Sequence, residues 1–214
     1  MKKIIYPEQL EYISSFIKQD NVLIKKIEKY AREHKVPILS KASSKFLEQL
    51  IIITQPKKVL EIGTAIAYSS IKIGRNLSSE GKLYTIEKSR DIIKIAKIFI
   101  IKAKLEDKIN LLNGDAREIM PKLKIKFDFI FLDADKDDYK KLFNLSLKLL
   151  KKGGLIFIDN LLWQGFAATN KVPKKYIHST KHIRDFNKIF MRTPSLCASI
   201  LPIGDGVGLG IKIK

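Results

Sequence analysis

Short apolar runs alternate with amphipathic helical segments through most of the chain. Five runs have the length of a strand and are bounded by turn-forming residues: 57–62, 83–87, 109–112, 127–132 and 155–158. Between them, apolar residues recur at the three- and four-residue spacing of helices. Strands that are apolar on both faces are typical of buried parallel sheets. The pattern therefore predicts an α/β fold with a doubly wound, mostly parallel sheet.

The two ends of the chain depart from this alternation. Residues 7–35 predict two amphipathic helices, and a third helix is expected to open at Ser43 and to end near residue 56. At the other end, 195–201 and 207–213 flank a turn that contains Pro and Gly, which predicts an antiparallel β-hairpin.

No linker, low-complexity tract or internal repeat divides the chain. At 214 residues, of which 45% are hydrophobic, it is long enough for one domain with a full core. We therefore expect a single domain over 1–214, with an α/β core over 57–214 and a helical extension over 1–56. Helices in that position commonly form a lid or a dimer contact, and we expect a homodimer.

Oxygen-bearing side chains follow two of the predicted strands. Asp133 comes directly after the fourth strand, and Asp159 and Asn160 come directly after the fifth. The carboxyl ends of neighbouring parallel strands lie roughly 5 Å apart, at the edge where open α/β sheets bind ligands. Three such groups suit a hard divalent cation such as Mg²⁺. Taken singly, each is more often a helix cap or a turn residue, but their pairing on one βαβ unit with Lys136 favours a site.

Basic residues far outnumber acidic ones. The chain has 41 Lys and Arg against 22 Asp and Glu, for a formal net charge of +19. This balance predicts a polyanionic partner, nucleic acid first. The alternative is a Lys-rich compositional habit, which explains the lysines more easily than it explains the shortage of acids.

Other features narrow the protein's setting. No apolar run approaches the length of a membrane span, the first seven residues are too short for a signal peptide, and Cys197 is alone. We therefore expect a cytoplasmic protein that does not contact a membrane. His178 and His182 have a spacing that can bind metal, but no Glu follows His178, and a solvated helix face is expected there.

Motifs at the strand ends resemble those of a known family. Glu61-x-Gly63 closes the first strand, Glu87 the second and Gly114-Asp115-Ala116 the third, which resembles the class I methyltransferases that bind S-adenosylmethionine. With Asp133-x-x-Lys136, Asp159-Asn160 and the turn over 202–206, the whole chain resembles the metal-dependent O-methyltransferases of the catechol and caffeoyl-CoA type. Tyr30-Ala31 and Val36-Pro37-Ile38 look most like the bacterial branch that methylates 5-hydroxyuridine in tRNA. The resemblance implies a Rossmann-like, seven-stranded sheet.

The resemblance also implies which residues bind S-adenosylmethionine. Glu87 matches the acid that accepts hydrogen bonds from the ribose hydroxyls, and Ser69 matches a residue that binds the methionine carboxylate, although a helix cap explains Ser69 equally well. The full set of expected cofactor-binding residues is Glu61, Gly63, Ser69, Glu87, Asp115, Ala116 and Asp133. The family commonly has glycine at one or both of the positions of Ala65 and Ala67, and the extra methyl groups bear on the affinity for the cofactor.

Methyl transfer requires a deprotonated oxygen held in line with the sulfonium methyl group. By resemblance, Asp133, Asp159 and Asn160 are the ligands of Mg²⁺ or another divalent cation, and Lys136 is the catalytic base. A divalent cation makes a hydroxyl group that binds it more acidic.

Three functions remain open at this point. The first is methylation of 5-hydroxyuridine in the tRNA anticodon loop, which the net charge and the Lys- and Arg-rich segment 171–192 favour. The second is the same chemistry on small catechols or on caffeoyl-CoA-like thioesters, where the anionic CoA also suits a basic protein. The third is an RNA-binding protein that has lost catalysis, against which the intact Asp133, Lys136, Asp159 and Asn160 argue.

Overall fold

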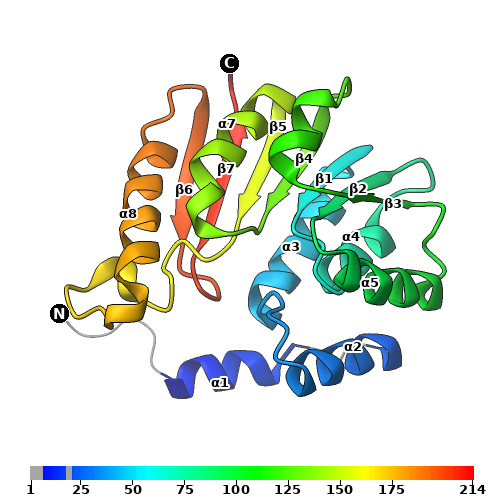
Figure 1. Cartoon of the computed structure of the whole chain (residues 1–214), viewed down its shortest axis with the longest axis horizontal. Coiled ribbons are helices and arrows are strands. Elements are labelled where there is room, and N and C mark those ends of the chain that lie inside the picture. The colour runs from blue at the N-terminus through cyan, green and yellow to red at the C-terminus, as the bar shows by residue number, and fades with distance from the viewer. Residues whose placement is uncertain (1–6, 18–20) are drawn as a thin grey trace.

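The computed structural model describes residues 7–17 and 21–214. Within these residues, the strands form one seven-stranded sheet in the order β3-β2-β1-β4-β5-β7-β6 (Figure 1). Strands β1 to β5 pair in parallel with their neighbours, whereas β7 is antiparallel to both β5 and β6. The strands are β1 (Lys58–Ile62), β2 (Lys82–Glu87), β3 (Ile109–Asn113), β4 (Phe127–Leu132), β5 (Leu150–Ile158), β6 (Leu196–Leu201) and β7 (Val207–Lys212). This confirms the predicted doubly wound sheet with an antiparallel C-terminal hairpin.

Helices cover both faces of the sheet. They are α1 (Pro7–Ser15), α2 (Val22–Glu33), α3 (Lys41–Thr54), α4 (Tyr68–Asn76), α5 (Arg90–Ala103), α6 (Ala116–Ile119), α7 (Tyr139–Leu149) and α8 (Ile177–Met191), with short 3₁₀ turns η1 (Met120–Lys122), η2 (Lys136–Asp138), η3 (Phe166–Ala168) and η4 (Lys174–Tyr176). None of the helices in the described ranges is both long and apolar enough to cross a membrane.

Alternating side chains of the strands build two hydrophobic layers. On β4, Phe129 and Phe131 pack with α2 to α5, and Ile130 and Leu132 pack with α7 and α8 on the other face.

The third helix begins two residues before Ser43, where the sequence predicted its start. The helix begins at Lys41, and the Ser40 hydroxyl accepts a hydrogen bond from the Ser43 N–H at 3.0 Å as its N-cap.

A buried carboxyl group ties β1 to the start of α4 and to β2. Glu61 is fully buried and accepts hydrogen bonds from the hydroxyls of Ser69 (2.5 Å), Ser70 and Thr85 (2.6 Å). Burial raises the pKa of Glu61 to about 7, and the hydroxyl hydrogen bonds oppose that increase.

Gly63 brings the ends of β1 and β4 unusually close together. Its φ is +103°, and a Cβ atom at this position would lie 1.8 Å from the carbonyl oxygen of Asp133. The backbone of Asp133 is held there because its N–H donates to the Ile62 carbonyl at 3.0 Å. Position 63 therefore requires glycine, because the Cβ of any other residue would overlap the backbone of Asp133.

We expect Gly63→Ala to destabilise the fold by at least about 3 kcal/mol, because it combines a left-handed φ with a steric overlap that only backbone movement relieves. Gly153→Ala is the matched control, since Gly153 also has a positive φ of +78° but no atom within 4 Å of the added Cβ. Gly153→Ala should lower the free energy of unfolding by only about 1–2 kcal/mol, which is the cost of the left-handed backbone conformation alone. Urea unfolding measures both, and equal losses would contradict the steric argument.

We expect Glu61 to make stability depend on pH. Its raised pKa means that the neutral form contributes stability below the ordinary value of 4.5, and that this contribution is lost as the pH rises through about 7. Glu61→Gln, which is neutral at every pH, should flatten the fall in unfolding free energy between about pH 5 and about pH 8. Asp159, with a pKa also near 7, contributes equally in both proteins. Identical pH profiles of urea unfolding would contradict this.

Candidate active site at the carboxyl edge of the sheet

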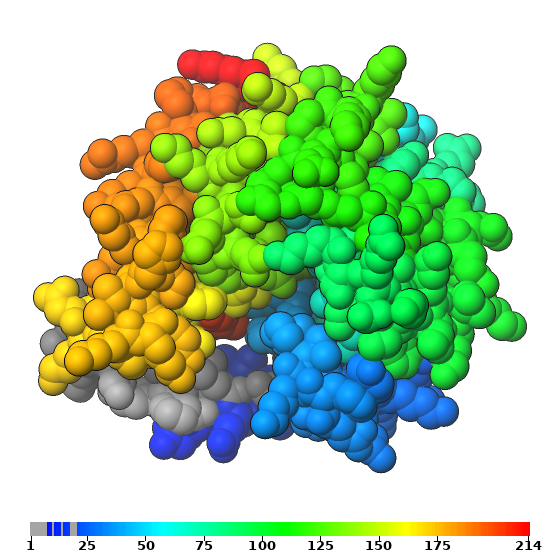
Figure 2. Space-filling view, viewed as in Figure 1, coloured from blue at the N-terminus to red at the C-terminus, as the bar shows by residue number. Residues whose placement is uncertain are grey.

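A cavity of about 970 Å³ opens at the carboxyl ends of the parallel strands. It lies at the switch point between β1 and β4, where the strand order reverses. The N-terminal extension contributes Pro37 and Ile38 to its wall. Figure 2 shows a hollow near the centre of the view, with blue N-terminal residues below it and residues of the α/β core above.

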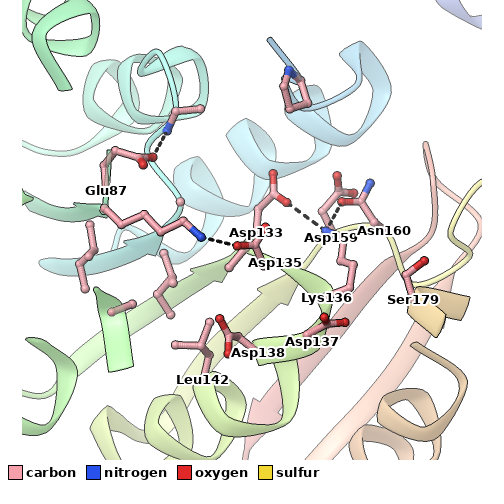
Figure 3. Close-up of a pocket in the computed structure, with 18 of the residues that line it drawn as sticks. Glu87, Asp133, Asp135, Lys136, Asp137, Asp138, Leu142, Asp159, Asn160 and Ser179 are labelled. Carbon is pink, nitrogen blue, oxygen red and sulfur yellow. Dashed lines mark hydrogen bonds and ion pairs between the residues drawn. The ribbon is translucent and has the colours of Figure 1, made fainter. Parts of the chain in front are cut away.

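Three predicted metal ligands and the predicted base converge in this cavity (Figure 3). The Lys136 Nζ atom lies 2.7 Å from Asn160 Oδ1 and 3.4 Å from Asp133 Oδ1. Asp159 follows β5 directly, and its backbone N–H donates to the Leu132 carbonyl at 3.2 Å, next to Asp133. The ladder between β4 and β5 therefore aligns these residues, as the sequence predicted.

The Asp159 carboxyl group fits a cation site. Its side chain is buried, and Oδ1 has no hydrogen-bond donor among the described residues. Burial, together with the smaller effect of the nearby charge of Asp133, raises the pKa of Asp159 to about 7. A buried carboxylate oxygen without a donor is costly unless a cation compensates it. The donor set of two carboxylates and one amide oxygen is the one that Mg²⁺ prefers.

Two residues to which the sequence analysis gave no role orient this cluster. The buried Tyr139 hydroxyl accepts a hydrogen bond from Lys136 Nζ at 2.6 Å and donates one to the Asp159 carbonyl at 3.0 Å. Burial raises the pKa of Tyr139 well above 10, so its hydroxyl keeps its proton. Asp205 accepts a hydrogen bond from Asn160 Nδ2 at 3.2 Å, which turns Asn160 Oδ1 toward Lys136.

On the other side of the switch point, Glu87 faces the cavity. Its two carboxylate oxygens accept hydrogen bonds from the backbone N–H groups of Ala65 (3.0 Å) and Ser89 (2.9 Å). Ala65, which donates the first of these N–H groups, and Ala67, two residues further on, have φ values of 45° and 66°, in the left-handed region that favours glycine. The loop thus adopts the glycine conformation with alanine in both places.

Asp115 and Ala116 line the same half of the cavity. Asp115 caps α6 by accepting from the Arg117 N–H at 2.8 Å, and the Arg117 guanidinium donates to both of its carboxylate oxygens. This contact lowers the pKa of Asp115 to about 2, so the side chain stays ionised.

The predicted cofactor-binding residues thus divide into two groups. Those at the cavity are Gly63, Glu87, Asp115, Ala116 and Asp133. Glu61 and Ser69 do not line it; they face each other in the buried network behind the β1–α4 loop. A cofactor role for these two stays a prediction.

Comparisons with known proteins agree with the fold and give the family. The profile of the family described as O-methyltransferase matches residues 13–213. A caffeoyl-CoA O-methyltransferase from Populus kitakamiensis is 36% identical over 173 residues, which cover 77% of this chain and 74% of the relative.

Solved structures lead to the same family. The O-methyltransferase TomG from Streptomyces achromogenes, involved in tomaymycin synthesis and solved in complex with SAM, has a TM-score of 0.84 at 27% identity and covers 95% of each chain. An O-methyltransferase from Bacillus cereus in complex with SAH has a TM-score of 0.82 at 28% identity, over 94% of this chain and 96% of that one. The chain belongs to the O-methyltransferase family.

Proposed function

We propose that this enzyme transfers a methyl group from S-adenosylmethionine to one of two vicinal hydroxyls on a small aromatic acceptor, either a catechol or a caffeoyl-CoA-like thioester. The observation that carries the proposal is the convergence of Lys136, Asp133 and Asn160 beside the buried Asp159 carboxyl group. The relatives named as caffeoyl-CoA O-methyltransferases support this acceptor class over RNA.

The half of the cavity around Glu87 is the proposed cofactor site. With both oxygens anchored by backbone N–H groups, the Glu87 carboxylate has a fixed position from which it can accept hydrogen bonds from ribose hydroxyls. Asp115 and Ala116 form the part of the wall suited to the adenine. The SAM and SAH complexes of the structural relatives support this proposal. The cofactor supplies the reactive sulfonium methyl group.

The other half is the proposed acceptor site. Asp133, Asp159 and Asn160 would hold a divalent cation, which supplies Lewis acidity toward a hydroxyl group. Lys136 would take the proton of the acceptor hydroxyl at Nζ in its neutral form. Tyr139 and Asn160 fix the position of this nitrogen, and the Lys136 side chain is only 10% exposed. Because the carbon chain is held, little reorganisation is needed for proton transfer.

We expect caffeoyl-CoA and catechol to be methylated in the presence of Mg²⁺, and a matched phenol with one hydroxyl to remain unmodified. Asp133→Ala should lower turnover by about a hundredfold or more, because losing a metal ligand should cost more than the roughly 10- to 100-fold loss typical of residues that only orient a ligand. Mass spectrometry of the products and calorimetry with S-adenosylmethionine give the two readouts. The variant should still bind the cofactor with at most a small loss from the missing Asp133 side chain, because the contacts expected from the Glu87 half remain. Full activity in excess chelator, or equal turnover of the single-hydroxyl phenol, would contradict the proposal.

Methylation of 5-hydroxyuridine in tRNA is the second candidate, favoured by the net charge of +19. Its hydroxyl lies beside the O4 carbonyl, so it presents two neighbouring oxygens, as a catechol does. Six basic side chains of the segment 171–192 are exposed: Lys171, Lys174, Lys175, Lys181, Lys188 and Arg192. Arg184 is different, since it donates to the backbone oxygens of Phe166, Ala167 and Thr169 and so holds the loop before α8. The homodimer that was expected from the N-terminal helices stays a prediction.

If tRNA is the substrate, Lys174→Ala combined with Lys175→Ala should weaken tRNA methylation and reduce its salt dependence by about one unit of slope per lost phosphate contact. Activity on a catechol should be spared. Lys122→Ala with Lys124→Ala removes equal charge ahead of β4, at the opposite edge of the sheet, and serves as the control. Equal effects of the two double variants, or unchanged methylated nucleosides in tRNA from a deletion strain, would leave the small-molecule acceptor as the function.

A further inference from the structure

A second group of metal-ligand side chains lies at the rim of the cavity. Asp137 in η2 meets His178 and His182 of α8, and one ligand atom from each of the three lies within 4.8 Å of the others. The two Nε2 atoms of the histidines are 3.2 Å apart. The other ring nitrogen of His178, Nδ1, is 3.6 Å from Asp137 Oδ1, so His178 would bind an ion through one nitrogen only. Asp137 itself lines the cavity, as does Ser179 of α8 (Figure 3).

The separation of the two ring nitrogens matches tetrahedral coordination. Bonds of about 2.0–2.1 Å from a Zn²⁺ ion place two ligand atoms roughly 3.3 Å apart. The helix supplies both rings because residues four apart share one face. Asp137 comes from a separate element that the chain brings to this face, so the ligands are not merely neighbours in sequence.

This ligand set differs in chemistry from the oxygen-only set of Asp133, Asp159 and Asn160. Imidazole nitrogens favour Zn²⁺ and similar transition-metal ions, whereas carboxylate and amide oxygens favour Mg²⁺. A solvated helix face was expected at His178 and His182, and His178 is exposed. The spacing of the two histidines did not reveal that the Asp137 carboxylate faces His178.

We propose that Asp137, His178 and His182 bind a divalent transition-metal ion of the Zn²⁺ class, with water in the fourth position. The site is additional to the proposed catalytic cation site and shares no residue with it. A metal ion there joins η2, which begins with Lys136, to α8, and so fixes two walls of the cavity relative to each other. Since the ion binds only the folded arrangement of the three ligands, it also stabilises the protein.

The test uses protein without a polyhistidine tag, kept in excess Mg²⁺ so that the oxygen site is occupied. Zn²⁺ is titrated against a chromogenic chelator. The wild-type protein should bind one Zn²⁺ ion that the double variant His178→Ala with His182→Ala loses. Each single histidine variant, and Asp137→Asn, should weaken the affinity by about tenfold or more because one of three ligands is lost.

Two controls separate this site from other sources of binding. His34→Ala removes the third histidine of the chain, which stacks on Tyr30 in α2, and should bind Zn²⁺ as the wild type does. Asp133→Ala should also retain the ion, because the two ligand sets are separate.

A spectroscopic readout identifies the ligands directly. Cu²⁺ in the wild-type protein should show nitrogen hyperfine structure in its EPR spectrum, and the double histidine variant should not. Zn²⁺ should raise the thermal midpoint of the wild type but not of that variant. The proposal is overturned if the double variant binds Zn²⁺ like the wild type, or if His34→Ala or Asp133→Ala removes the same ion. Should the double variant unfold, the exposed single variant His178→Ala decides.

Discussion

The contact between Gly63 and the backbone of Asp133 sets the geometry of the active site. Because position 63 has no side chain, the ends of β1 and β4 approach closely at the place where the strand order reverses. The loop after Gly63 then supplies the Ala65 N–H that fixes Glu87, while Asp133 faces the other half of the same cavity. A side chain at 63 would separate the two halves, and with them the proposed cofactor and acceptor sites.

The distribution of charge within the protein is as informative as its total. Among the residues that the structure describes, eight acidic ones line the cavity, against three basic ones, although the whole chain carries a net charge of +19. The eight acids are Glu87, Asp115, Asp133, Asp135, Asp137, Asp138, Asp159 and Asp205. A cavity wall of this sign attracts cations, such as a sulfonium or a divalent metal ion, and the basic exterior attracts anions. The composition alone pointed only to the second of these.

What could be predicted from the sequence follows from local patterns. Asp133, Asp159 and Asn160 were brought together correctly because parallel strands of a βαβ unit end at one edge, whatever packs around them. Tyr139, the first residue of α7, was missed because its hydrogen bond to the Asp159 carbonyl joins residues 20 positions apart. Asp205 was missed because its contact with Asn160 joins residues 45 positions apart. The same holds for Asp137 and His178, which lie 41 positions apart and meet only because η2 and α8 pack side by side.

Two ion pairs connect the half of the cavity around Glu87 to the segment 135–138, which comprises Asp135 and η2. Lys88 pairs with Asp135, and Arg117 bridges Asp115 to Asp138 at 2.9 Å. The side chains of Lys88 and Asp135 are 64% and 66% exposed, so solvent screens their attraction and the pair adds little to stability. A ligand that displaces Lys88 therefore breaks a weak contact, whereas the Glu87 carboxylate behind it is held by two backbone N–H groups. The Lys88 side chain can thus yield to a ligand without displacing Glu87.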